Sequence, residues 1–196
     1  MKPARHAFSL IELLVVLAII LILFTMYWGF SSRNYQQVQQ KNCRGNLQKI
    51  FIALQIYANE HDRKFPVVTG AISSERPLDL LVPRYTADTA TFVCPGSKDS
   101  PLPSGSSLTN GRISYAYFMG RRSTDEALPL MSDKLTDTQS KAVGEYVFST
   151  DGKAPGNNHH KYGGNFLFGD GRPEFSSARL SFPLSTQGVV FLNPKP

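Results

Sequence analysis

A histidine and an aspartate near the C-terminus have the side chains that metal binding and acid–base catalysis use. His160 is followed by nine residues and then by Asp170 and Gly171. Because Asp-Gly stands between two apolar runs, it predicts a two-residue hairpin turn with Gly171 at positive φ. The pair could bind a metal or act in catalysis, or the imidazole could form a hydrogen bond across the hairpin and fix the loop. We favour the structural interpretation, because the sequence places no third ligand or nucleophile nearby.

An apolar run of residues 8–30 holds a single acid, Glu12, near its start. The run is long enough to cross a bilayer as a helix, which takes about 20 apolar residues. Lys2 and Arg5 precede it, so the positive-inside rule predicts a cytoplasmic N-terminus and an exported C-terminal part. A secretory signal fits poorly, because its small-residue cleavage site follows the apolar core, whereas Ala7 precedes it.

The carboxylate of Glu12 would face hydrocarbon and would need a partner there. If the leader is removed before Phe8, the new α-amine of a neighbouring copy is a cation at a similar depth. Pairing the two would favour stacking of copies at one axial offset. Alternatively, Glu12 reaches the lipid headgroups from the end of the helix. We favour the assembly role.

The segment of residues 7–12, Ala-Phe-Ser-Leu-Ile-Glu, resembles the cleavage and methylation site of type IV prepilins and type II secretion pseudopilins. The resemblance implies that a prepilin peptidase cuts between Ala7 and Phe8 and that Phe8 is then N-methylated. Glu12 takes the fifth mature position, where the family carries an acid used in assembly. Ala7 departs from the family pattern, since glycine is usual before the cut.

The C-terminal spacing of His160 and Asp170 is similar to a signature of a pilin-like group associated with prepilin processing. The resemblance to major pseudopilins also implies a possible calcium site, because these proteins commonly bind calcium in a C-terminal loop. Such a site takes six to eight oxygen ligands. The candidate ligands are scattered along the sequence, and turns explain them equally well; they are Asp133, Asp137, Asp151 and Asp170. We predict no cofactor, with calcium as the candidate left open.

Helical patterning continues beyond the apolar run, through residues 31–61. Apolar residues from Leu47 to Ala58 recur at spacings of three and four, which is typical of an amphipathic helix. Phe65-Pro66 predicts the end, because the residue before proline is biased away from helix. This segment is also similar to the corresponding helix of major pseudopilin-like proteins.

Residues 62–196 form one predicted domain rich in Gly, Pro, Ser and Thr. Residues 113–118, 145–149, 165–168 and 189–192 have the aromatic and β-branched content of short strands, and residues 78–83 could form a helical turn. Pro173 removes a ladder donor, so the strand after Asp170-Gly171 should lie at an edge. We therefore predict an α+β, pilin-like fold, with a long helix packed on a small antiparallel sheet.

Cys43 and Cys94 are the only cysteines. In an oxidising compartment they could form a disulfide, which would join the helix to the domain. Closing a loop of about 50 residues would contribute about 4 kcal/mol in the chain-entropy model. Two unpaired buried thiols are the alternative, and we favour the disulfide.

The net charge says little about partners, because the basic residues behind the formal net charge of +6 are dispersed along the chain. A nucleic-acid-binding pilin would need a basic stripe with stacking aromatics, so we expect no nucleic-acid partner. Nor does the sequence hold a phosphate-binding Gly-rich loop or a zinc-binding pattern.

The sequence thus predicts a structural subunit rather than an enzyme: a pseudopilin or pilin-like protein that we expect to serve type II protein secretion. Its expected partners are prepilin peptidase, other copies or related pseudopilins, an inner-membrane assembly platform and membrane lipid. We expect it in the bacterial inner membrane as a single-pass protein with a periplasmic domain, and then in a fibre in the periplasm or at the cell surface. The alternative is a membrane-tethered binding protein or enzyme that uses His160 and Asp170.

Overall fold

The computed structural model describes residues 9–196, with residues 28–33 described by their backbone only. The predicted leader, residues 1–7, and the cleavage site between Ala7 and Phe8 therefore lie outside the described residues. The chain divides into two compact units, Met1–Gln37 and Val38–Pro196.

One helix, α1 (Leu10–Glu60), contributes to both units. Its backbone is helical throughout, including at Gly29. The helix ends where Asp62 and Arg63 take the left-handed conformation, with φ of 52° and 59°. The Arg63 N–H then bonds to the Ala58 carbonyl at 2.9 Å, a bond typical of helix C-termini. The predicted end before Pro66 is therefore close to the observed one.

Within the second unit, α1 buries the predicted apolar stripe. Successive buried side chains follow spacings of three and four residues, which places them on one face; they are Cys43, Leu47, Ile50, Leu54 and Ala58, each at most 1% exposed. The opposite face carries exposed residues such as Lys49 and Ile52. This part of α1 is amphipathic, as the periodicity predicts.

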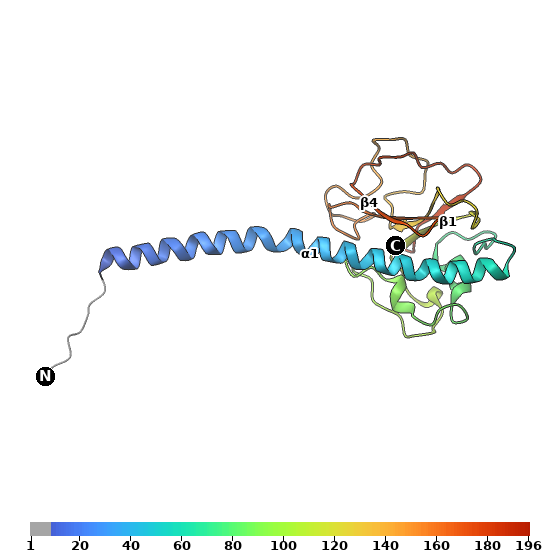
Figure 1. The fold of residues 1–196 in the computed structure, drawn as a ribbon, viewed down its shortest axis with the longest axis horizontal. Helices are drawn as coiled ribbons and strands as arrows, with labels where there is room; N and C mark the ends of the chain where they lie inside the picture. Colours follow the sequence, from blue (N-terminus) through green and yellow to red (C-terminus); the bar gives the residue numbers. More distant parts are fainter. Residues whose placement is uncertain (1–8) are drawn as a thin grey trace. The chain divides into compact units, whose positions relative to one another are not determined.

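Five antiparallel strands form the sheet of this unit (Figure 1). They are β1 (Tyr115–Met119), β2 (Pro129–Asp133), β3 (Gly164–Phe168), β4 (Pro173–Ser176) and β5 (Val190–Leu192). Their order in the sheet is β4-β3-β2-β1-β5, so β4 and β5 are the edges. The α+β fold is confirmed, and so is the edge position of the strand that begins at Pro173.

The two faces of the sheet bury separate clusters, because alternate side chains of a strand point to opposite faces. On β1, Tyr115 and Tyr117 pack with the helix, whereas Ala116 and Phe118 pack on the other side. In Figure 1 the later turns of α1 lie along one face, and the loops in orange and red cover the other. The sheet is thus the middle layer of this unit.

Short helices connect the long helix to the sheet: α2 (Glu75–Leu78), η1 (Asp79–Leu81), η2 (Thr89–Phe92) and η3 (Leu108–Asn110). Two of them, α2 and η1, account for the helical turn predicted at residues 78–83.

The strand predicted at residues 145–149 is wrong, because this segment stays outside the sheet. Its backbone bonds instead to a neighbouring loop, through Val147 N–H to the Ala178 carbonyl at 2.9 Å and Leu180 N–H to the Glu145 carbonyl at 3.0 Å. Only an isolated bridge between Tyr146 and Arg179 results. The central strand β2, by contrast, was not predicted.

Candidate functional site

The first unit presents an apolar helical surface. Residues from Leu10 to Tyr27 form a stretch of 18 that is long and apolar enough to cross a membrane, and none of it is buried within the chain. Exposed large apolar side chains cost free energy in water in proportion to their area. This surface therefore requires lipid or another protein around it.

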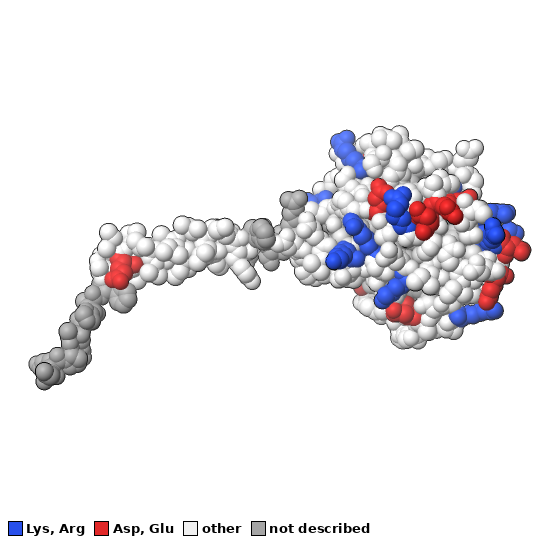
Figure 2. All heavy atoms as spheres, viewed as in Figure 1, with Lys and Arg blue, Asp and Glu red and all other residues white. Residues whose placement is uncertain are grey.

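Glu12 is the only charged residue between Leu10 and Tyr27, and it lies in the first turn of α1. Figure 2 shows a single red patch on this otherwise white stretch. The Glu12 backbone N–H bonds to the Ser9 carbonyl at 3.0 Å, but among residues 9–196 no cation pairs with its carboxylate. Among the described residues, the Glu12 carboxylate therefore has no cationic partner.

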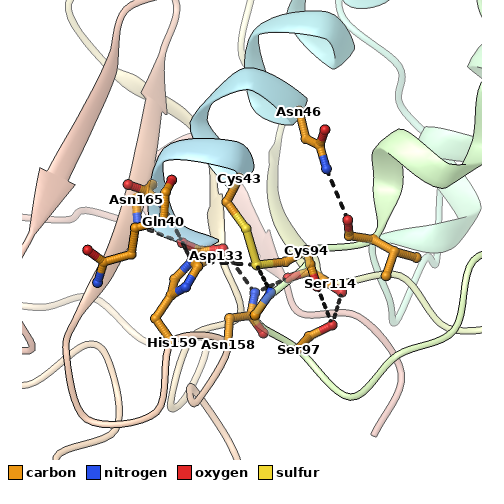
Figure 3. Close-up of a disulfide and its surroundings, with 12 residues drawn as sticks. Gln40, Cys43, Asn46, Cys94, Ser97, Ser114, Asp133, Asn158, His159 and Asn165 are labelled. Carbon is orange, nitrogen blue, oxygen red and sulfur yellow. Dashed lines mark hydrogen bonds and ion pairs between the residues drawn. A yellow bond between two sulfur atoms is a disulfide. The ribbon is translucent and has the colours of Figure 1, made fainter. Parts of the chain in front are cut away.

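In the second unit, a disulfide joins Cys43 of α1 to Cys94, which follows η2 (Figure 3). Both residues are buried, and their Cα atoms are 5.3 Å apart. Asn46, one turn further along the helix, donates to the Val93 carbonyl at 3.0 Å. The structure therefore contains the covalent link between helix and domain that the sequence favours.

A buried ion pair lies against this disulfide. The His159 Nε2 is 3.2 Å from Asp133 Oδ2 and 3.5 Å from Cys94 Sγ. Neither side chain is more than 1% exposed. Asp133 comes from the end of β2 and His159 from the loop before β3, so the fold unites side chains that are distant in sequence.

Two asparagines complete the shell around the Asp133 carboxylate (Figure 3). Asn158 Nδ2 donates to Oδ1 at 3.0 Å, and Asn165 donates to Oδ2 from its backbone N–H at 2.7 Å and from Nδ2 at 3.0 Å. Arg44 of α1 donates in turn to Asn165 Oδ1 at 2.9 Å. Buried charge is tolerated in proteins when it is paired and hydrogen-bonded in this way.

These contacts determine the pKa of Asp133. Burial alone would raise it, but the positive charge of His159 and the hydrogen bonds from His159, Asn158 and Asn165 outweigh burial and hold the pKa of Asp133 below its usual value. The carboxylate is therefore kept in its charged form.

The other ring nitrogen of His159, Nδ1, is buried without a hydrogen-bond partner among the described residues. Gly96 packs directly over it, since a Cβ at this position would lie 2.7 Å from Nδ1 and 2.5 Å from the Asn158 carbonyl oxygen. Only glycine allows so close an approach. We call Cys43, Cys94, Asp133 and His159 the buried centre.

The structure separates the predicted pair of His160 and Asp170. His160 precedes β3 and Asp170 follows it, and the strand spans roughly 13 Å at about 3.3 Å per residue. The His160 ring lies against Gly152, whereas Asp170 forms an ion pair with Arg172, its Oδ2 3.6 Å from Nε. Neither the metal or catalytic pair nor the hydrogen bond across the hairpin is formed.

Asp170 and Gly171 do form a hairpin turn, but its loop has three residues rather than two. Gly171 N–H bonds to the Phe168 carbonyl at 2.9 Å, and Gly171 has φ of 83°, a pattern typical of three-residue hairpin loops. A Cβ on Gly171 would lie 2.5 Å from the Phe51 ring of α1. The Asp-Gly signature thus lets the hairpin pack closely on the helix.

The carboxylates considered for calcium are not brought together. Asp133 lies in the buried centre, Asp137 pairs with Lys141 at 2.6 Å, Asp151 with Ser149 at 3.0 Å, and Asp170 with Arg172. Within the part of the chain that the structure describes, the one group of three or more His, Cys, Asp or Glu with metal-ligand spacing is the buried centre.

Charges of both signs are interspersed on the face of the domain that Figure 2 shows. Pairs such as Arg84 with Glu60, at 2.7 Å, neutralise one another locally. This face therefore presents no continuous basic stripe.

Sequence reasoning missed His159, Asn158 and Asn165. It selected the neighbouring His160 by its spacing to Asp170, yet His160 is exposed and has a left-handed φ of 57°. The left-handed residue turns the chain, so that one histidine faces inward and the next outward. No sequence period marks which of the two is buried.

Comparison with known proteins finds a match at the N-terminus. Residues 2–28 match the model of the prokaryotic N-terminal methylation motif. No curated protein and no solved structure matches the chain.

Proposed function

We propose that this chain is a structural fibre subunit. Its methylation motif and its apolar helix are consistent with a type IV pilin or pseudopilin. Prepilin peptidase removes residues 1–7 at the cytoplasmic face, and the new N-terminal Phe8 is methylated. The subunit then leaves the inner membrane and joins a periplasmic or surface fibre, which we assign to type II protein secretion or a related machine. No enzymatic activity is part of this proposal.

The observation that carries the proposal is the match of residues 2–28 to the methylation motif, together with the uncompensated acid of α1. Glu12 has no cationic partner among residues 9–196, and an acid on an apolar membrane helix is costly unless paired. The α-amine of Phe8 on a neighbouring copy supplies a cation at a similar depth. A single pairing of this kind per subunit would set the axial offset between copies.

The second unit supports the same role. The disulfide between Cys43 and Cys94 and the buried stripe of α1 bind the domain to the helix. Pulling on the helix during assembly would therefore move the domain with it. We place this domain in the periplasm, where disulfides persist.

The alternative, a tethered enzyme or binding protein, required His160 and Asp170 to act together. Because β3 lies between them, no observation favours that function over the structural one.

Mass spectrometry of the N-terminal peptide from native membranes tests the proposal. We expect the mature chain to begin with N-methylated Phe8. A matched Phe8→Ser variant should still insert, but with a different N-terminal residue or with reduced processing. A native chain that still begins at Met1 would overturn the proposal.

A further inference from the structure

We propose that the buried centre is a zinc site when its disulfide is reduced, with Cys43, Cys94, His159 and Asp133 as the four ligands. The disulfide and the metal would then be two alternative links between α1 and the domain. This inference concerns the second unit alone and does not depend on the proposed role in a fibre.

The ligand atoms are already grouped for a small cation. All four lie within 4.8 Å of one another, and all four residues are buried. They come from four segments: α1, the segment after η2, the end of β2 and the loop before β3. Two thiolates, one imidazole and one carboxylate form a ligand set suited to Zn²⁺, which is usually four-coordinate and tetrahedral in closed sites.

Two distances of the centre match the edges of a zinc tetrahedron. Ligand distances of about 2.3 Å for sulfur and about 2.0–2.1 Å for nitrogen and oxygen give edges of about 3.5 Å for S–N and about 3.3 Å for N–O. The structure has 3.5 Å from Cys94 Sγ to His159 Nε2 and 3.2 Å from that nitrogen to Asp133 Oδ2. The two sulfurs, joined at 2.05 Å in the disulfide, have to separate to an edge of about 3.8 Å.

The surrounding contacts hold the Asp133 carboxylate and the His159 ring in positions from which both can bind a metal. Asp133 is held as a carboxylate by Asn158 and Asn165, whose donors at 2.7–3.0 Å remain in place when Oδ2 also contacts a cation. Such outer partners orient metal ligands and tune their affinity. The His159 ring is fixed by Gly96 packed over it, and its proton can reside on Nδ1 while Nε2 binds the metal.

Zinc binding requires that the disulfide between Cys43 and Cys94 first be reduced. A trialkylphosphine gives two electrons to the disulfide, and water supplies two protons and one oxygen, so the products are two thiols and the phosphine oxide. Zn²⁺ then displaces both thiol protons to solvent, together with the Nε2 proton that His159 carries in its ion pair with Asp133. Two thiolates and one carboxylate leave the occupied site with a net charge of about −1, which His159 does not change.

Cobalt titration of the full-length chain in detergent tests the inference, with Co²⁺ as the spectroscopic substitute for Zn²⁺. After phosphine reduction we expect one Co²⁺ per chain, with the strong visible absorption of tetrahedral cobalt and a thiolate charge-transfer band. Zn²⁺ should displace it stoichiometrically and should protect both thiols from alkylation. The oxidised chain should show neither band.

Matched variants assign the ligands. His159→Gln and Asp133→Asn should each weaken Co²⁺ binding at least about tenfold, since even outer partners contribute ten- to hundredfold, while His160→Gln and Asp170→Asn should bind like the wild type. Because the first pair could also loosen the fold, the wild-type spectrum and stoichiometry stand as an independent measurement. Failure of the reduced wild type to bind, an octahedral spectrum, or equal binding by all four variants would overturn the inference.

Discussion

Two carboxylates of this chain, Asp133 and Glu12, lie in opposite environments. Asp133, in the second unit, is at most 1% exposed and accepts hydrogen bonds from Asn158 and Asn165 besides its ion pair with His159. Glu12, in the first unit, lies on an exposed apolar surface and meets no cation among residues 9–196. The domain pairs its buried charge internally, whereas the Glu12 carboxylate has no cationic partner among residues 9–196.

We expect Asp133 to act in folding and Glu12, under the proposed function, to act in assembly. A charge that is paired within the chain contributes to the stability of one copy, and removing it should appear in unfolding experiments. A charge whose partner lies in another copy contributes nothing to the isolated chain, and removing it should appear only when copies associate. Substitutions at the two sites should therefore change different measurements.

The largest effect is expected from Glu12→Ala. Without the carboxylate, the α-amine of the neighbouring Phe8 has no partner in the apolar core, so incorporation into fibres should be lost while membrane insertion is retained. Comparing sheared fibre and membrane fractions by immunoblot measures both. Glu60→Ala, an exposed acid at the other end of α1, should assemble normally. Wild-type assembly by the Glu12 variant would remove the main support for the structural role.

Next in size is the loss of the disulfide through Cys43→Ala with Cys94→Ala. The bridge spans 51 residues, so the chain-entropy model predicts that the free energy of unfolding falls by about 4 kcal/mol. Urea unfolding of the full-length chain in detergent, followed by the near-ultraviolet circular dichroism of its buried tyrosines, measures this change. The single variants should match the double one. An unchanged midpoint would show that the bridge contributes little.

The smallest effect is expected from Asp133→Asn, and it should depend on pH. Because the folded pKa of Asp133 is lowered, its contribution is complete above the unfolded value of about 3.9 and is lost as pH falls through the lower folded value. At pH 7 the variant should lose about 2 kcal/mol, the range for hydrogen bonds to charged groups.

The same unfolding experiment, repeated from pH 7 down to about pH 3, shows whether the stability deficit of the variant shrinks or grows toward acid. The deficit of Asp133→Asn relative to the wild type should shrink as the wild-type carboxylate becomes protonated. Asp170→Asn, on an exposed turn, should leave the curve unchanged. A deficit that grows toward acid would contradict the lowered pKa.

Sequence alone predicted the elements whose pattern is local. The spacing from Leu47 to Ala58 predicted the buried face of α1, and the aromatic and β-branched content of residues 113–118 and 165–168 predicted β1 and β3. Strand β2 was missed because it begins at Pro129 and ends in Ser132 and Asp133, which favour turns over strands. Its place in the sheet comes from pairing with β1 and β3, which no local pattern records.

The candidate sites, too, were predictable only where their residues are close in sequence. The apolar helix from Leu10 to Tyr27 was predictable because its apolar residues and Glu12 are contiguous in sequence. The buried centre was not, because Asp133 and His159 meet only through the sheet and the loop before β3. Of this centre, only the pairing of Cys43 with Cys94 was anticipated, since these are the only two cysteines.

The edges of the sheet have a consequence for how such molecules associate. One edge, β4, starts with Pro173 and carries Glu174, whose carboxylate contacts Arg172, and the other, β5, has three residues. Short, charged or proline-bearing edges are poor templates for a foreign strand. If the chain assembles into a fibre as proposed, crowded domains would thus resist runaway β-aggregation.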